Sequence, residues 1–172
     1  MIKPPFIDPQ AVHLLSRWAA PRRALFLDRD GVINVNHGYV HRAEDTDWLP
    51  GIFQRVRAAH AAGMVPVVVT NQAGIGRGYY DEATFLRFTR WIHAQFAAQD
   101  APLLATFWCP HHPTAAVGDY LQLCPCRKPA PGMLDAAIKR FGIDAAGSLM
   151  LGDSDSDAAA AAAAGVAFER VG

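Results

Sequence analysis

Residues 24–32 decide the fold and read ALFLDRDGV, four apolar residues followed by two aspartates and a glycine. An apolar run of this length, bounded by turn residues, is typical of a buried strand. The polar segment Asp28-Arg29-Asp30-Gly31 begins where the apolar run stops, so we expect it at the carboxyl end of that strand. Two carboxylates there can divide the work, one as nucleophile or metal ligand and the other as acid and base. The alternative is an ordinary turn rich in Asp and Gly.

Apolar runs and helical patterns alternate along the rest of the chain. The apolar runs predict strands at 65–69, 104–108 and 148–151, with a further candidate at 166–171. The helical patterns predict helices at 51–62, 81–98 and 132–141, and an alanine-rich one that ends at Gly165. This alternation predicts an α/β fold with a mostly parallel sheet and helices on both faces. In such sheets ligands bind beyond the carboxyl ends of the strands.

The composition limits the partners of the chain. Its 172 residues suit one domain, 1–172, and 51% hydrophobic with 19% charged residues excludes intrinsic disorder. Lys plus Arg and Asp plus Glu are both 16, so no basic excess favours nucleic acid or an anionic membrane. No apolar run has the length of a membrane span or of a signal-peptide core, and three cysteines suit a reducing compartment. We therefore expect a cytoplasmic monomer with a small-molecule partner.

Residues 1–22 form an N-terminal extension ahead of the first predicted strand. Val12, Leu15 and Trp18 lie three apart, as on one face of a short helix. We expect that face to pack on the core. The alternative is a role in self-association.

Polar side chains follow the other strands as well. Thr70 and Asn71 can donate hydrogen bonds to an anion, although a polar loop is the simpler interpretation. Residues 152–157 read GDSDSD, which either caps a helix or gathers carboxylates around a cation. An acidic crevice without a metal would repel itself, so Mg²⁺ is implied. With Lys128 from the loop before the last acidic segment, these groups would form a phosphate site, and attack by a carboxylate would give an aspartyl phosphate.

All three cysteines fall in the segment 109–126. Cys109 is followed by His111 and His112, and twelve residues further on Cys124 and Cys126 complete a C-x-H…C-x-C pattern. Three thiolates and one imidazole make a tetrahedral Zn²⁺ site, and four protein ligands leave no open position for water. We therefore expect a structural zinc loop. The spacing alone does not choose between the two histidines, and three unrelated thiols are the alternative.

The ordered motifs D-x-D-G, T-N, K and G-D-x-x-x-D resemble those of the haloacid dehalogenase (HAD) superfamily of phosphatases, over residues 24 to about 165. The resemblance implies a Rossmann-like fold, with Asp28 as nucleophile and Asp30 as general acid and then base. It implies Mg²⁺ held by the Asp28 carboxylate, the Asp30 backbone carbonyl and Asp153. Thr70 and Lys128 would steady the phosphoryl group.

The cysteine segment C-P-H-x-P…C-x-C-R-K-P is similar to one branch of that superfamily, which includes the heptose-1,7-bisphosphate 7-phosphatases and the histidinol-phosphate phosphatases. The branch lacks a large cap domain, and its zinc is ligated by the histidine that corresponds to His111, with Cys109, Cys124 and Cys126. The loops 34–41 and 72–78 look like the heptose type, which implies removal of the 7-phosphate from a heptose bisphosphate. The substrate contacts implied by this resemblance are Asn36, His37, Gly38, Tyr39, Asn71, Gln72 and Arg127.

One position departs from the heptose type, which usually carries lysine directly after the acid of the fourth motif, where this chain has Ser154. Two alternatives to a heptose phosphatase follow. One is a histidinol-phosphate phosphatase, and the other is a zinc-stabilised binding protein on a phosphatase fold without activity.

Overall fold

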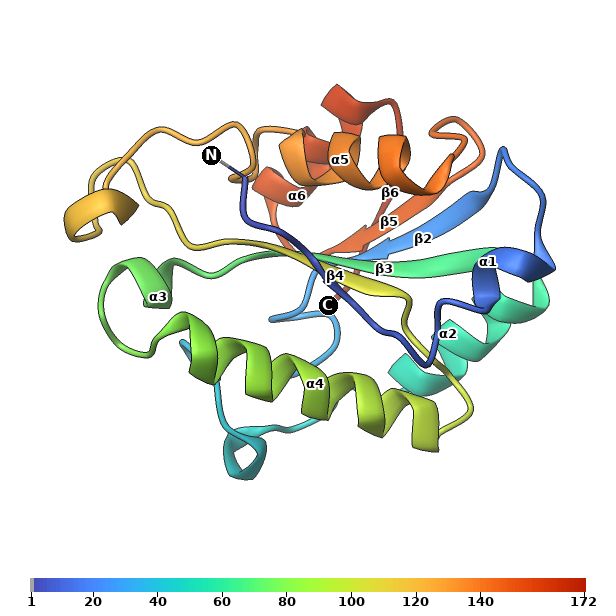
Figure 1. Cartoon of the computed structure of the whole chain (residues 1–172), viewed down its shortest axis with the longest axis horizontal. Coiled ribbons are helices and arrows are strands. Elements are labelled where there is room, and N and C mark those ends of the chain that lie inside the picture. The colour runs from blue at the N-terminus through green and yellow to red at the C-terminus, as the bar shows by residue number, and fades with distance from the viewer. Residues whose placement is uncertain (1) are drawn as a thin grey trace.

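The structure is a computed structural model that describes residues 2–172, and six strands form its single sheet in the order β1-β4-β3-β2-β5-β6 (Figure 1). All neighbouring strands pair in parallel except β1, which is antiparallel to β4. The strands are β1 (Phe6–Ile7), β2 (Arg23–Leu27), β3 (Met64–Asn71), β4 (Ala105–Cys109), β5 (Leu149–Gly152) and β6 (Ala167–Arg170). The predicted α/β fold with a mostly parallel sheet is confirmed.

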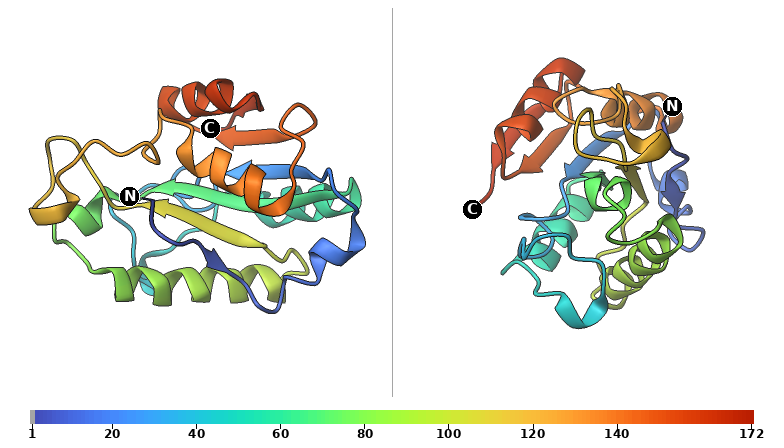
Figure 2. Two further views of the ribbon diagram at one scale, coloured as in Figure 1. Left: turned by 45° about the horizontal axis from the view of Figure 1, so that its top comes forward. Right: turned by 90° about the vertical axis from the view of Figure 1, so that its left-hand side faces the viewer.

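Helices cover both faces of this sheet, as Figures 1 and 2 show. One layer contains α2 (Ile52–Ala61) and α4 (Glu82–Ala98), and the other contains α5 (Gly132–Phe141) and α6 (Asp155–Ala164). The α4 helix begins where the Asp81 side chain accepts the backbone N–H of Thr84, and α6 ends at Gly165 with a φ of 74°. Shorter helices are α1 (Leu14–Arg17) and α3 (Ala73–Gly76), with 3₁₀ turns η1 (Ala43–Asp45) and η2 (Gly118–Tyr120).

The two faces of the sheet build two separate cores. Along β2, Ala24 and Phe26 belong to the cluster under α5 and α6, whereas Leu25 and Leu27 belong to the cluster under α2 and α4. This alternation follows from the two-residue period of a strand, and burial on both faces explains why the run ALFL contains no polar residue. Burial of each of the three large side chains, Leu25, Phe26 and Leu27, contributes about 1.5–3 kcal/mol. The sheet therefore provides a rigid platform for the loops at its carboxyl edge.

The N-terminal extension packs differently from the prediction. Leu14 is fully buried and Leu15 and Trp18 pack partly on the core, but Val12 is 45% exposed, so its predicted place on the packed face is wrong. The α1 helix has a single turn, which is too short to hold all three side chains on one face. The sequence prediction also missed the edge strand β1, a pair of residues that gives no periodic signal, and the short α3. Met1 lies outside the described residues.

The two longest links between the main elements are residues 28–51, after β2, and residues 110–131, after β4. Within residues 2–172 they hold only single-turn helices and loops, with no inserted domain, in line with the expected lack of a large cap. Among the same residues, none of the helices combines the length and the apolar character that a membrane span requires.

Candidate active site

A cavity of about 470 Å³ opens at the carboxyl edge of the sheet, where β2, β3 and β5 end side by side. Most of the predicted site residues line it: Asp28, Asp30, Asn36, Gly38, Tyr39, Asn71, Gln72, Arg127, Lys128 and Asp153. Thr70 lies fully buried beside them, at the end of β3. His37 does not line this cavity, because its imidazole points to Asp47, 2.7 Å away. Motifs far apart in the sequence thus meet at one place, as the parallel topology requires.

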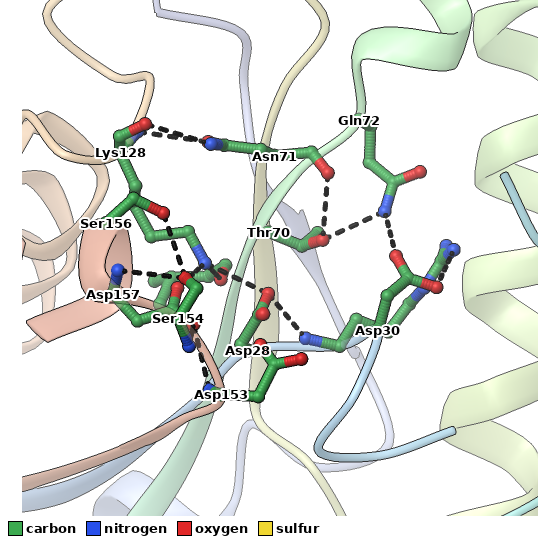
Figure 3. Close-up of polar contacts among 12 residues, drawn as sticks. Asp28, Asp30, Thr70, Asn71, Gln72, Lys128, Asp153, Ser154, Ser156 and Asp157 are labelled. Atoms are coloured by element: carbon green, nitrogen blue, oxygen red, sulfur yellow. Dashed lines mark hydrogen bonds and ion pairs between the residues drawn. The ribbon is translucent and has the colours of Figure 1, made fainter. Parts of the chain in front are cut away.

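Lys128 forms ion pairs with two of the carboxylates that line this cavity (Figure 3). Its Nζ lies 2.9 Å from Oδ1 of Asp28 and 2.6 Å from Oδ1 of Asp157, and it also donates to the Val69 carbonyl at 2.9 Å. Burial disfavours the charged amine, but the two carboxylates outweigh this and raise the pKa of Lys128 above its usual value. A permanent cation is therefore fixed beside Asp28.

The backbone of Lys128 is fixed as firmly as its side chain. The amide of Asn71 donates from Nδ2 to the Lys128 carbonyl and accepts the Lys128 N–H at Oδ1, both at 3.0 Å. This paired contact joins the end of β3 to the loop after β4. Asn71 therefore positions Lys128, and its predicted contact with substrate stays a prediction.

The carboxyl groups of the cavity differ in their tendency to ionise. Burial raises the pKa of Asp28 to about 7, with Asp157 and Asp30 adding to the rise and Lys128 opposing it. Burial and the nearby Asp157 charge also raise the pKa of Asp153. For Asp157, Lys128 outweighs the effect of burial and holds the pKa below its usual value. Without a further cation these carboxylates therefore compete for one ammonium group.

A divalent cation would relieve that competition. Carboxylate oxygens of Asp28, Asp153 and Asp157 lie within 4.8 Å of one another. A set made only of oxygen donors suits a hard cation such as Mg²⁺. Asp157 is the least free of the three, because its Oδ1 faces Lys128 and its Oδ2 accepts the N–H groups of Asp153 and Ser154. The geometry thus leaves Asp28 and Asp153 as the better candidates for direct ligation.

Asp157 is a site residue that the sequence analysis did not list. Its spacing in G-D-x-x-x-D predicts a carboxylate in the first helical turn, and it does form a capping box with Ser154 at the start of α6. Its ion pair with Lys128 spans 29 positions of sequence, so no local signal could show it.

Gly31 has a steric reason to be glycine. Its φ is +91°, and a Cβ at this position would lie 1.9 Å from Oδ2 of Asp153. The fourth residue of the D-x-D-G segment must therefore lack a side chain, so that the loops after β2 and β5 can approach each other.

Asp30 is held by donors from three directions. Its Oδ1 accepts from Arg29 Nη2 at 3.0 Å and from Asn34 Nδ2 at 3.1 Å, and its Oδ2 accepts from Gln72 Nε2 at 3.3 Å. The same Gln72 nitrogen donates to Thr70 Oγ1 at 2.8 Å, and Gln72 Oε1 accepts from Tyr80 at 2.5 Å. Gln72 thus links Asp30 to Thr70 on the floor of the cavity.

The second cluster of possible metal ligands lies at the end of β4 and in the loop that follows it, which contains η2. Donor atoms of Cys109, His111, Cys124 and Cys126 lie within 4.8 Å of one another, and all three thiols are free. The two histidines differ in their contacts: Nδ1 of His112 accepts the N–H groups of Thr114 and Ala115, at 3.1 and 2.8 Å, whereas His111 lies with the thiols. A hydrogen bond from Cys126 lowers the pKa of Cys109 to about 6, so one thiolate is readily available to a cation. Three sulfurs and one imidazole suit Zn²⁺.

Comparisons with known proteins agree with this fold and cavity. The profile of the HAD-hydrolase-like family matches residues 125–171. The D-glycero-alpha-D-manno-heptose-1,7-bisphosphate 7-phosphatase of Burkholderia mallei is 49% identical over 144 residues, which cover 84% of this chain and 76% of that protein. The D-glycero-beta-D-manno-heptose-1,7-bisphosphate 7-phosphatase of Escherichia coli K12 is 46% identical over 76% of this chain and 68% of its own.

One similar solved structure also contains bound ligands. The D,D-heptose 1,7-bisphosphate phosphatase of B. bronchiseptica, in complex with magnesium and phosphate, has a TM-score of 0.75 and 37% identity. The match covers 85% of this chain and 78% of that one. Sheet, cavity and comparisons together define a phosphoric monoester hydrolase. The chain belongs to the HAD superfamily, in the family of the heptose-1,7-bisphosphate 7-phosphatases.

Proposed function

We propose that this chain removes the 7-phosphate of D-glycero-D-manno-heptose 1,7-bisphosphate, through an aspartyl-phosphate intermediate on Asp28. The observation that carries the proposal is the pairing of Asp28 with a buried Lys128 at the floor of an open cavity. The substrate is the one named for relatives that are 45–49% identical to this chain.

The residues divide into three roles in this mechanism. Mg²⁺, held by the carboxylates of Asp28 and Asp153 and by the Asp30 backbone carbonyl, would offset the negative charge of the phosphoryl group. The Thr70 hydroxyl and the Lys128 ammonium steady the phosphoryl oxygens. Asp28 is the nucleophile and Asp30 exchanges the proton.

In the first step, a carboxylate oxygen of Asp28 attacks phosphorus. The bond from phosphorus to the ester oxygen breaks, and its electron pair goes to that oxygen, which takes the proton of the Asp30 carboxyl group. The products are the dephosphorylated alcohol, aspartyl phosphate and ionised Asp30. Protonation of the leaving oxygen matters because a sugar alkoxide is a poor leaving group.

In the second step, Asp30 takes a proton from a water molecule while the water oxygen attacks phosphorus. The bond between phosphorus and the Asp28 oxygen breaks, and the electron pair returns to the carboxylate. Inorganic phosphate leaves, and Asp30 is again protonated for the next turnover. One residue thus acts as acid and then as base.

The rim of the cavity supplies candidate contacts for the rest of the substrate. Arg127 lines the cavity, and its planar guanidinium suits a phosphate group that is not transferred. In the segment 36–39, Gly38 donates its N–H to Asn36 Oδ1 at 3.0 Å, and Tyr39 meets Tyr79 edge to face, with ring centroids 4.8 Å apart. We assign Asn36, His37, Gly38, Tyr39, Asn71, Gln72 and Arg127 as substrate contacts, His37 by a movement of its exposed ring.

The Cys109, His111, Cys124 and Cys126 cluster is proposed to hold one structural Zn²⁺. Its four donors close the coordination sphere, and none of the four lines the cavity. Cys126 precedes Arg127 and Lys128 directly, so the zinc would fix the segment that presents both cations.

We further propose that residues 1–172 act as one domain, as a monomer in the cytoplasm and without nucleic acid or membrane partners. The balance of 16 basic and 16 acidic residues supports the part of this proposal that concerns nucleic acid and membranes, because it gives no general excess of positive charge.

The test is phosphate release from a panel of esters at saturating Mg²⁺. The panel contains both anomers of the heptose 1,7-bisphosphate, histidinol phosphate and hexose phosphates. We expect kcat/KM for one of the heptose anomers to exceed kcat/KM for every other ester of the panel by at least about tenfold. A preference for histidinol phosphate would replace the proposed substrate. No turnover of any ester would favour a binding protein on a phosphatase fold.

A further inference from the structure

Arg29 lies between the two proposed catalytic aspartates, Asp28 and Asp30, in the sequence, and its side chain is buried. Its side chain is only 2% exposed, and it is among the largest fully buried side chains of residues 2–172. The guanidinium lies over the ring of Phe88 on α4, 5.2 Å from the ring centroid. Burying a permanent charge is costly unless it is paired, so the contacts of this group indicate what it serves.

Those contacts converge on a single nitrogen. Nη2 of Arg29 donates to Oδ1 of Asp30 at 3.0 Å and to the Val40 carbonyl at 2.5 Å. Within the described part of the chain, Nε and Nη1 have no hydrogen-bond partner. The buried charge is thus directed at Asp30 and at the residue that follows the segment 36–39.

The two oxygens of Asp30 are held unequally as a result. Oδ1 accepts two hydrogen bonds, one charge-assisted from Arg29 and one from Asn34 at 3.1 Å. From residues 2–172, Oδ2 accepts only the longer bond of 3.3 Å from Gln72. Two donors occupy the lone-pair directions of Oδ1 and leave Oδ2 as the oxygen that can exchange a proton with the substrate.

We propose that Arg29 is a positioning residue: it orients the Asp30 carboxyl group for proton transfer and ties that orientation, through Val40, to the segment 36–39. The inference rests on the proposed function, since it takes Asp30 as the acid and base. The stack on Phe88 holds the guanidinium plane, so the α4 helix takes part in the alignment.

The experiment compares two esters that differ in their need for an acid. A 4-nitrophenolate leaves readily without protonation, whereas an alkoxide does not, so misplacement of Asp30 slows the alkyl ester more. Arg29→Met keeps an unbranched apolar chain against Phe88, and Arg29→Lys keeps the buried charge without the planar fork. The alkyl ester is the heptose bisphosphate or, if wild type does not hydrolyse it, the best alkyl ester of the panel.

Arg29→Met is expected to lower kcat/KM, which reports the first step alone, about tenfold on the alkyl ester and by less than about threefold on 4-nitrophenyl phosphate. Arg29→Lys is expected to fall between Met and wild type. The control is Arg90→Met. Arg90 is exposed and lies on α4, as Phe88 does, but its guanidinium packs 5.8 Å from the centroid of the Phe6 ring and does not contact Asp30. The substitution should leave both rates unchanged.

A double-mutant cycle separates positioning from a structural role. With Asp30→Asn in place, adding Arg29→Met should cause no further loss on the alkyl ester, since Arg29 acts through Asp30. Equal losses of kcat/KM on both esters, additive losses in the cycle, or unchanged kcat/KM in both variants would overturn the proposal. If Arg29→Met does not fold, the same cycle is run with Arg29→Lys. If the enzyme does not hydrolyse the heptose bisphosphate, the proposed substrate is wrong but the role of Arg29 can still be tested, because the cycle is then run on the other alkyl ester.

Discussion

Two clusters of metal-type ligands lie at the carboxyl edge of one sheet, and they differ in donors and in access. The carboxylates of Asp28, Asp153 and Asp157 are hard donors, and all three residues line an open cavity. The cluster of Cys109, His111, Cys124 and Cys126 has soft donors and lies away from that cavity. A metal in an open cluster keeps a coordination position for water or substrate. A metal that is closed off by four protein ligands can only hold segments of the chain together. The contrast teaches that two neighbouring clusters of possible metal ligands in one fold can suit different tasks, one in chemistry and the other in stability.

The largest effect is expected when the open cluster loses its nucleophile. Asp28→Asn keeps the size of the side chain and removes the anion that attacks phosphorus, so turnover should fall at least about hundredfold, or ~2.7 kcal/mol of barrier. The melting temperature should not fall, because the amide can still accept a hydrogen bond from Lys128. Phosphate-release assays and a melting curve check both parts. Retained turnover would assign the nucleophile to another residue.

The closed cluster should show the opposite pattern. His111→Ala removes one of four proposed ligands and should lower the melting temperature by about 5–10 °C, through loss of zinc that stabilises the native state. His112→Ala is the matched control, since the His112 ring bonds to Thr114 and Ala115 outside the proposed ligand set, so the substitution should leave zinc in place. Elemental analysis and melting curves measure the outcome. Equal zinc in the two variants would contradict the assignment of His111.

We expect an intermediate pattern for Asp157, because its Oδ1 pairs with Lys128 and its Oδ2 accepts the N–H groups of Asp153 and Ser154. Asp157→Asn should lower kcat about tenfold by loosening the Lys128 ammonium, and lower the free energy of unfolding by about 1–2 kcal/mol. Asp155→Asn serves as the control, since Asp155 is exposed in the same helical turn and pairs with Arg170. Steady-state kinetics and urea unfolding check this prediction. If both substitutions had the same effect, the ion pair with Lys128 would carry no catalytic role.

The smallest effect is expected at Ser154, where the heptose type usually has lysine. The structure makes Ser154 the N-cap of α6, with its Oγ accepting the Asp157 N–H at 3.3 Å. Ser154→Lys should lower KM for the bisphosphate by up to about tenfold through an added cation at the cavity, and cost about 1 kcal/mol of stability through the lost cap. KM for a monophosphate should change less. An unchanged KM for both substrates would show that this position acts only at the helix start.

Local patterns predicted the fold and most of the cavity. Strand and helix periods placed the main elements, and parallel topology then required Asp28, Thr70 and Asp153 to meet, which they do. Contacts that depend on distant residues were not predictable: the Lys128–Asp157 pair, the Asn71 contact with the Lys128 backbone, and the burial of Arg29 on Phe88. The exposed Val12 shows the limit of periodicity in a one-turn helix.

The central claim is that Asp28 carries the phosphoryl group. The most direct measurement adds borohydride to the Mg²⁺-loaded enzyme during turnover of the heptose bisphosphate, because an acyl phosphate is reduced to the alcohol while a free carboxylate is not. Mass spectrometry of the peptide that contains residues 24–32 should show homoserine in place of Asp28, only when substrate is present. Phosphate release with an unmodified Asp28, or with reduction at another carboxylate, would contradict the account.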